Sequence, residues 1–456
     1  MKARRRSRKG RGRAIASRPL QPLAFLGLAA ILACASLAAF AGGREGHGRD
    51  EAMAGRPSKG RIPDADADWL RRSRAPGVVV AAGFDDIREW ARYNWDKSDC
   101  NPAYQVRVDG QLAGCRNNAW DSSIKTSGKG ALRFDVLPRT GEDGGGNVVI
   151  PFGDYATSQF GADSEFWVSW RQRMDERYYQ GYRAQGGGLT YFKHVIIAQG
   201  DMPYPGSRRT STANACSEAE LVIVSSDPAN GPAFPNGYIE CRRYQGFEQV
   251  LQRGSYAGDA MGSKVVTRQN MRTGPHGEFN CIFHPPRRLD QSGCFTYRPD
   301  EWITYLVHVK LGPEGRAVSS VSNREQPGYV DSTYELYAAY AGEDFQLLHR
   351  QSGIVIPKGQ YYLGGDPMQK SSYQSGWSPN NGHPQARYGK LWLLSYMTFK
   401  DPTEDTPKAS TWYDEVIVSR CRIAAPGYPI PEQCNPAPEA RPNPVTASSA
   451  SAPAGQ

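Results

Sequence analysis

The chain has 456 residues, of which 22% are charged and 39% hydrophobic, and it contains 49 glycines, 24 tyrosines and 10 tryptophans. Such a composition favours strands and turns over helices. The formal net charge of +9 does not indicate a nucleic-acid-binding protein, because residues 1–41 carry nine basic side chains and no acidic one. Everything after residue 41 is formally neutral, so the charge supports no nucleic-acid partner.

The N-terminal segment predicts that the protein is exported. An apolar run over residues 24–41 follows the basic stretch and ends in Ala39-Phe40-Ala41, which is the order of a secretory signal peptide. We expect cleavage after Ala41. A second interpretation is an uncleaved anchor, because a run of this length can span a bilayer, and a third is a lipoprotein signal at Cys34. All three predict a secreted, periplasmic or extracellular protein.

Composition divides the chain into four parts. Residues 1–41 form the signal peptide or anchor, and residues 42–77 are polar, lack periodicity and are predicted to be a disordered linker. Residues 78–434 show no internal repeat and are predicted to form one domain. Residues 435–456 are rich in Pro, Ala and Ser, which predicts a disordered tail.

The central part is predicted to consist of strands. Apolar and polar residues alternate over 166–173, which indicates a strand with one buried face. Further β-rich runs lie at 221–224, 305–309, 334–340, 390–398 and 412–419. Clusters of Gly, Pro, Asn and Asp separate them, as hairpins and loops require. We therefore expect an all-β fold, an antiparallel β-sandwich or jelly roll with long loops.

The cysteines agree with export. Eight follow the signal segment, and they fall into four close pairs, which predicts the disulfides Cys100–Cys115, Cys216–Cys241, Cys281–Cys294 and Cys421–Cys434. Each bridge would close a short loop and contribute about 3 kcal/mol in the chain-entropy account. No Cys-x-x-Cys pair occurs, so a zinc site is not expected.

Several segments together resemble the concanavalin-A-like lectin and glucanase superfamily. They are Gly83–Asp86, Gly128–Phe134, Ser164–Arg171, Glu301–Tyr305 and Trp412–Ser419. The resemblance covers about residues 80–422 and implies two stacked antiparallel sheets, with a glycan lying across one of them. Because the superfamily includes lectins, glycoside hydrolases and polysaccharide lyases, the fold does not decide the activity.

The hydrolase branch of this superfamily carries Glu-x-Asp-x-x-Glu on one strand, which places the carboxylates for retaining chemistry. The sequence lacks this pattern. The nearest arrangement is Glu218 and Glu220, two residues apart. These carboxylates either pair with arginines and face solvent, or Glu220 takes part in catalysis or sugar binding.

The lyase branch needs a cation or donor against a uronate carboxylate, a base for the C5 proton and an acid for the leaving oxygen. Lyases that resemble alginate lyases commonly use Arg, Gln or Asn, His and Tyr. We expect the catalytic residues to be Arg173, Gln199, Glu220, Tyr396 and His194. We expect the substrate to be bound by Trp167, Arg171, Lys193, Asp201 and Trp392. If these assignments hold, the side chains line one groove.

Each assignment rests on strand alternation. Arg171 and Arg173 share the face opposite to the predicted core, and a guanidinium suits a carboxylate. His194 is an attractive base, but alternation places it opposite to Gln199 unless a bulge intervenes. The Gln-Ile-His signature of alginate-lyase-like enzymes is replaced by Gln199-Gly200-Asp201. This departure leaves a direct transfer of the mechanism open.

Structural interpretations stand beside the functional ones. His194 could be a buried, hydrogen-bonded histidine. Arg171 and Arg173 could pair with acids of a neighbouring strand, and the two tryptophans could serve packing alone. Asp414 in the closing strand is expected to anchor a loop.

The leading hypothesis is an exported polysaccharide lyase that cleaves a uronate-containing glycan by β-elimination. The alternatives are a lectin-like carbohydrate-binding protein without catalysis and a glycoside hydrolase of the same fold. We expect a monomer whose partner is a polysaccharide, with no nucleic acid and no membrane contact beyond the N-terminal segment. No cofactor and no catalytic metal are expected, and a structural calcium ion is left open.

Overall fold

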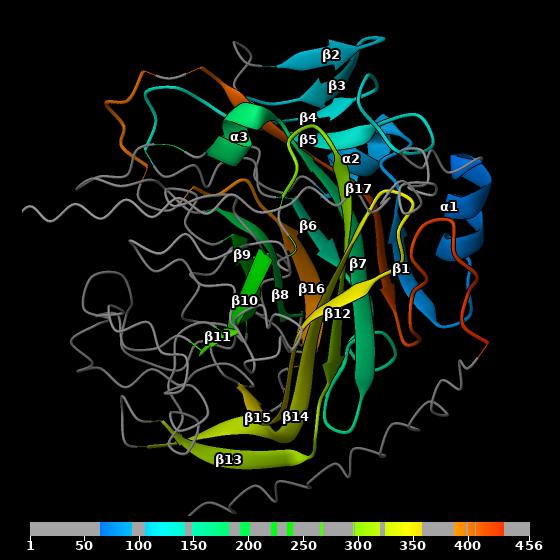
Figure 1. Cartoon of the computed structure of the whole chain (residues 1–456), viewed down its shortest axis with the longest axis vertical. Helices are drawn as coiled ribbons and strands as arrows, with labels where there is room; N and C mark the ends of the chain where they lie inside the picture. Colours follow the sequence, from blue (N-terminus) through cyan, green and yellow to red (C-terminus); the bar gives the residue numbers. More distant parts are fainter. Residues whose placement is uncertain are drawn as a thin grey trace, which may run out of the picture. The chain divides into compact units, whose positions relative to one another are not determined.

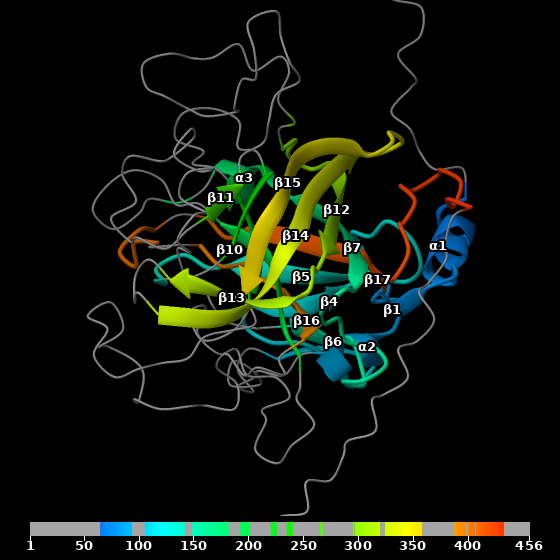
Figure 2. The ribbon, with the colours of Figure 1, turned by 90° about the horizontal axis from the view of Figure 1, so that it is seen from below.

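The computed structural model is mostly β. It describes residues 64–93, 105–141, 148–180, 182, 192–200, 220–225, 235–239, 265–267, 295, 297–319, 324–357, 387–397, 400–405 and 407–432. All strand pairs among these residues are antiparallel and form two sheets, called sheet A and sheet B below (Figures 1 and 2). The prediction of an all-β antiparallel fold is therefore confirmed.

Sheet A is the larger of the two. Its strands are β1 (Val78–Ala82), β2 (Val106–Val108), β3 (Gln111–Gly114), β4 (Asn118–Asp121), β5 (Ala131–Val136), β7 (Glu165–Met174), β12 (Trp302–Lys310), β13 (Glu314–Ser319), β14 (Arg324–Tyr340), β15 (Gln346–Pro357) and β17 (Ala409–Ser419). They run in the order β13-β14-β12-β7-β17-β5-β4-β3-β2, with β1 also paired to β17 and β15 to β14. The closing strand β17 thus lies beside β7, in the middle of the sheet.

Sheet B is the smaller sheet. Its strands are β6 (Val148–Pro151), β8 (Lys193–Gln199), β9 (Glu220–Ser225), β10 (Pro235–Ile239), β11 (Val265–Thr267) and β16 (Tyr388–Leu393). They run in the order β11-β10-β9-β8-β16-β6. The predicted strand at 390–398 is shorter in the structure, where β16 ends at Leu393.

One hydrophobic core lies between the facing sides of the two sheets. It includes Val168 and Trp170 of β7 in sheet A, and Ile197 of β8 and Leu391 of β16 in sheet B. Trp167, which stands between the core residues Phe166 and Val168 in the chain, belongs to a separate cluster on the other side of sheet A. The alternation predicted for 166–173 is therefore confirmed, and each sheet has an inner face toward this core and an outer face away from it.

Three short helices accompany the sheets in the described residues: α1 (Ala65–Ser73), α2 (Ile87–Tyr93) and α3 (Glu176–Gln180). The prediction of a disordered linker over 42–77 is wrong for 64–77. Asp64 caps α1 by accepting a hydrogen bond from the Ala67 amide at 2.9 Å, and Arg72 is buried in an ion pair with Glu415 of β17. A partner more than 300 residues away leaves no periodic signal in the local sequence.

Other N- and C-terminal predictions lie outside the described residues. These are the signal segment 1–41, the remainder of the linker up to 63, and the tail 435–456. Among the residues that the structure does describe, no helix is long and apolar enough to cross a membrane. Cys115 and Cys421 are disulfide-bonded. The other six cysteines of the predicted pairs are not among the described residues, so the pairing scheme stays a prediction.

Candidate functional site

The outer face of sheet B brings together basic and aromatic side chains. Ile196, Ala198 and Leu394 form a small apolar cluster there, and half-buried Trp392 and Tyr396 pack against it. These side chains come from β8 and from β16 with the segment that follows it, which are neighbours in the sheet (Figure 1). We call this surface the sheet B outer face.

A β-bulge places Lys193 on this face. The register of β8 against β9 shifts between Lys193 and Val195, so that two consecutive residues, His194 and Val195, both face the core. Ile196 then faces outward. Without the extra residue, alternation would turn Lys193 inward, where an unpaired ammonium group is strongly disfavoured.

Lys193 and Tyr396 form a cation–phenol pair on the sheet B outer face. The Nζ atom of Lys193 lies 5.0 Å from the centroid of the Tyr396 ring. The backbone also joins them, because the Lys193 amide donates to the Tyr396 carbonyl at 3.0 Å. A cation and a hydroxyl-bearing ring are therefore held side by side, a combination that can neutralise an anion and exchange a proton.

Two more residues of β16 share this face. Trp392 lies opposite Ile196 in the register, and Lys390 lies opposite Ala198. Directly opposed residues of an antiparallel pair project to the same side of the sheet. Lys390 was missed in the sequence, although it stands two positions before Trp392 in the same predicted strand and so shares its face.

Two predicted residues can be placed only in part. Glu220 is the Cα partner of Ala198 across β8 and β9, and its side chain is not described. Asp201 follows β8 and lies outside the described residues. By register, the backbone of Glu220 is one strand away from Lys390, with Ala198 between them.

The interior between the sheets contains His194 and Gln199. His194 is fully buried and hydrogen-bonds at both ring nitrogens, with Gln172 and Tyr297, each at 2.7 Å. Burial lowers the pKa of His194 to about 3, so its ring is neutral. Gln199 lies opposite the core residue Tyr388. Neither side chain lies on the sheet B outer face.

The outer face of sheet A contains Trp167, Arg171 and Arg173. Arg171 is buried and pairs with Glu415, Nη1 to Oε1 at 3.3 Å. Arg173 pairs with Asp300, Nη2 to Oδ1 at 2.7 Å. The Trp167 ring stacks on a neighbouring histidine ring, with centroids 3.9 Å apart.

The predicted residues therefore do not line one groove. Lys193, Trp392 and Tyr396 lie on the sheet B outer face, His194 and Gln199 face the core, and three predicted residues lie on the outer face of sheet A. The expectation of one groove fails because alternation gives the face of a strand and not its sheet. β7 belongs to sheet A, whereas β8 and β16 belong to sheet B.

No metal centre is apparent in the described part of the chain. There, no group of three or more His, Cys, Asp or Glu side chains is arranged to hold a metal ion. A buried charge cluster joins Asp414 and Glu415 with Arg72 and Arg171 on the outer face of sheet A. Asp414 accepts hydrogen bonds from the amide and hydroxyl of Thr126, both at 2.8 Å, so it anchors a loop as expected.

Comparison with known proteins gives structural likenesses only. No protein-family model matches the chain, and no curated protein matches it. An endo-β-1,4-glucuronan lyase from the fungus Trichoderma reesei is 10% identical, with a TM-score of 0.33 over 69% of this chain and 93% of that one. A marine alginate lyase from Aplysia kurodai is 9% identical, with a TM-score of 0.37 over 66% and 86%. A cellulose-induced protein, Cip1, is 10% identical, with a TM-score of 0.31 over 76% and 99%.

Solved structures with this likeness thus include polysaccharide lyases, the class that the sequence resemblance names. At these TM-scores they carry no conclusion about what the present chain does. The activity has to come from its own side chains.

Proposed function

We propose that the protein is an exported lyase that cleaves a uronate-containing glycan by β-elimination on the sheet B outer face. The observation that carries this proposal is the Lys193–Tyr396 pair, with Nζ 5.0 Å from the ring centroid. The apolar run at 24–41 behind a basic stretch supports export.

The pair suits the chemical demands of the reaction. Lys193 binds the uronate carboxylate and stabilises the negative charge that spreads onto it when the C5 proton leaves. Tyr396 is the proton carrier: its phenolate oxygen takes the C5 proton, and the phenol so formed donates that proton to the leaving O4, which restores the phenolate. The electron pair of the C5–H bond becomes the C4–C5 double bond as the C4–O4 bond breaks. The product is an unsaturated uronate and a free hydroxyl on the other fragment.

The neighbouring residues fit substrate binding. Trp392 offers an aromatic ring on which a sugar can stack. Lys390 shares this face by register, and its side chain is buried there. Glu220 stays a predicted member of the site, and its backbone is the register partner of Ala198.

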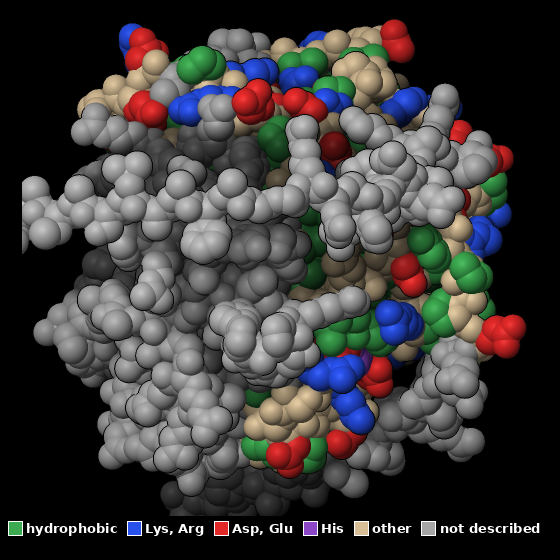
Figure 3. All heavy atoms as spheres, viewed as in Figure 1, with side chains coloured by type: hydrophobic (Ala, Val, Ile, Leu, Met, Phe, Trp, Pro, Cys, Tyr) green, Lys and Arg blue, Asp and Glu red, His purple; other side chains and the backbone are tan. Residues whose placement is uncertain are grey.

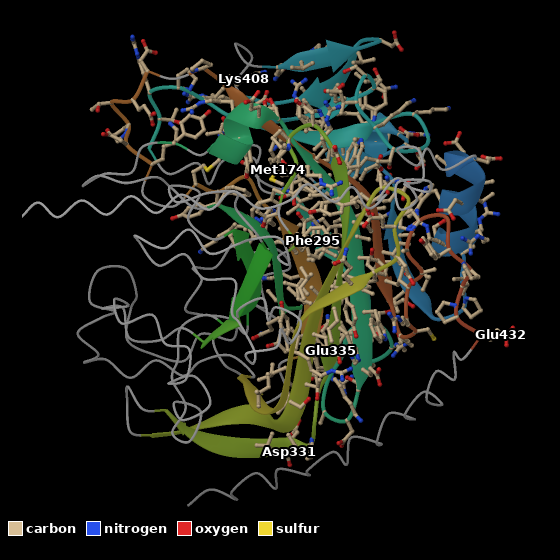
Figure 4. The ribbon with its side chains drawn as sticks, viewed as in Figure 1. Met174, Phe295, Asp331, Glu335, Lys408 and Glu432 are labelled. Atoms are coloured by element: carbon tan, nitrogen blue, oxygen red, sulfur yellow. The ribbon has the colours of Figure 1, made fainter. Side chains whose placement is uncertain are left out.

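The experiment uses the purified secreted chain and a panel of uronate-containing and neutral glycans. A lyase product has a conjugated double bond that absorbs in the ultraviolet, and we expect its absorbance to grow on at least one acidic glycan. Lys193→Ala and Tyr396→Phe should each reduce the rate about a hundredfold or more, because they remove charge stabilisation and proton transfer. Lys408→Ala is the matched control, since Lys408, which is labelled in Figure 4, pairs with Asp135 of sheet A.

Other outcomes distinguish the alternatives. Binding without absorbance would select a lectin-like protein, and new reducing ends without absorbance would select hydrolysis. A fully active Lys193→Ala variant on a cleaved acidic glycan would refute this site while leaving the reaction class in place.

A further inference from the structure

A buried hydrogen-bond network crosses the core directly behind the Lys193–Tyr396 pair. Its central member is His194, which is adjacent to Lys193 in sequence and projects from the opposite face of β8. Gln172 of β7 and Tyr297 contact the two ring nitrogens at 2.7 Å each. The network therefore links sheet A to the bulge of sheet B.

The hydrogen-bond pattern fixes the tautomer of His194. The Nε2 amide of Gln172 donates to the Thr411 hydroxyl at 2.9 Å and to the Tyr413 hydroxyl at 3.0 Å. The Oε1 atom of Gln172 is left to accept from His194, so Nδ1 of the ring carries the hydrogen. Nε2 then accepts from Tyr297, whose pKa is raised well above its usual value by burial and whose hydroxyl keeps its proton.

Tyr413 of β17 reaches the backbone at the same place. Its hydroxyl lies 2.8 Å from the carbonyl oxygen of His194 and 2.6 Å from that of Leu394. The His194 carbonyl already accepts the Leu394 amide at 3.0 Å. One hydroxyl of sheet A thus sits at the junction where β8 meets the chain leaving β16, with Lys193 and Tyr396 on the other face.

We infer that His194 and Tyr413 are positioning residues that hold the bulge and so set Lys193 against Tyr396. His194 is neutral, fully buried and turned away from the sheet B outer face, so it acts only through Lys193. The inference deepens the proposed function and rests on it for the role of Lys193. A bulge turns a strand register by one residue, so losing it would direct the lysine away from its partner.

The test removes single oxygen atoms. Tyr413→Phe keeps the ring and deletes the hydroxyl at the junction, which is gentler than replacing His194. Tyr182→Phe is the matched control, because Tyr182 is also fully buried and its hydroxyl donates to a backbone carbonyl, that of Pro407, at 3.0 Å. Amide hydrogen exchange at Lys193 and Leu394 and the acylation rate of the Lys193 amine are measured in the protein without substrate. The kinetic parameters kcat and KM are measured with a glycan that the wild-type protein cleaves.

We expect Tyr413→Phe to speed exchange at the two amides about three- to tenfold, the range that one net hydrogen bond allows. Lys193 should be acylated faster, and kcat should fall about tenfold or more with KM nearly unchanged, because misplacement costs rate more than binding. The control should change none of these. A purely structural hydroxyl would lower the melting temperature without this local and kinetic signature.

Two results would overturn the inference. One is exchange and acylation at Lys193 that match wild type in Tyr413→Phe. The other is faster exchange with an unchanged kcat. If wild type cleaves no glycan, the proposed function fails, while exchange and acylation still decide whether Tyr413 holds Lys193 in place.

Discussion

His308 of β12 is held between two carboxylates on the outer face of sheet A. Its Nδ1 atom lies 2.7 Å from Glu335 and its Nε2 atom 2.7 Å from Glu165, and its ring stacks on Trp167. Glu335 of β14 is labelled in Figure 4. Burial opposes the charge of His308, but the two carboxylates outweigh it and raise the pKa of His308 above its usual value. For Glu335, burial is likewise outweighed by hydrogen bonds, and its pKa falls to about 2.

These shifts predict a pH-dependent contribution to stability. Because the pKa of His308 is raised in the folded state, protonated His308 stabilises the fold at a pH below its unfolded pKa of about 6.5. This contribution is lost as the pH rises through the folded pKa. Because the pKa of Glu335 is lowered in the folded state, its carboxylate stabilises the fold above a pH of about 4.5, and this contribution is lost as the pH falls toward 2. We therefore expect His308→Gln to lower the free energy of unfolding more at pH 5.5 than at pH 8.5. At pH 5.5 the loss should be about 1.5–3 kcal/mol, the range for hydrogen bonds between charged groups. Urea unfolding at both pH values measures the difference, and equal costs would contradict it.

Arg173 gives a second prediction at the scale of one residue. It lies on the outer face of sheet A, paired with Asp300 and 5.5 Å from the centroid of the Trp412 ring. Since Lys193 lies on sheet B and Arg173 on sheet A, we expect Arg173→Ala to retain the rate of glycan cleavage within about twofold. Loss of its ion pair with Asp300 should also cost little stability, as is usual for ion pairs near the surface. Initial rates measured beside Lys193→Ala check this. A hundredfold loss in Arg173→Ala would return the site to sheet A.

At the scale of elements, α1 is fastened to the sandwich by charge. Arg72 is almost fully buried and contacts Asp68 of its own helix at 2.7 Å as well as Glu415 of β17. Asp68 in turn accepts from the Gly427 amide at 3.1 Å. A buried pair of this kind is costly to break because the remaining carboxylates lose their compensating charge.

Arg72→Met should therefore destabilise the protein by about 3–5 kcal/mol. Arg88→Ala is the matched control, because Arg88 also pairs with an aspartate, Asp86, but is exposed, and no measurable change is expected. Chemical denaturation of both variants gives the comparison. An Arg72→Met variant as stable as wild type would show that α1 does not depend on this pair.

At the scale of the whole molecule, the positions of two central strands followed from the sequence, β7 from its alternation of apolar and polar residues and β17 from a β-rich run. The pairing of the strands did not follow from the sequence, because neither the bulge in β8 nor the position of β7 in sheet A produces a local sequence pattern. Three of the residues predicted to line one groove share the sheet B outer face and three lie on sheet A, and their roles in binding and catalysis stay predictions. The neutral charge after residue 41 agrees with Figure 3, where acidic and basic side chains are interspersed on the face shown.

The disulfides give a prediction for the complete chain. Non-reducing peptide mapping of the secreted protein should find four bridges between sequence neighbours, including Cys100–Cys115 and Cys421–Cys434. Cys115 and Cys421 are both disulfide-bonded in the structure. Reduction should lower the stability by about 3 kcal/mol for each short loop in the chain-entropy account. A bridge between Cys115 and Cys421 themselves, or free thiols at two of the eight positions, would refute the scheme.

The pairing of the first strand with the last has a consequence for the order in which the protein is built. β1 pairs with β17, and Arg72 meets Glu415 343 positions later in the chain. The ribosome therefore synthesises the partners of the N-terminal elements last. Strands β5 and β7 also pair with β17, so these pairings cannot form before β17 has been synthesised. Contacts this distant in sequence close slowly. A chain led out of the cell by its N-terminus would thus stay unfolded, and able to thread a secretion channel, until nearly all of it had been synthesised.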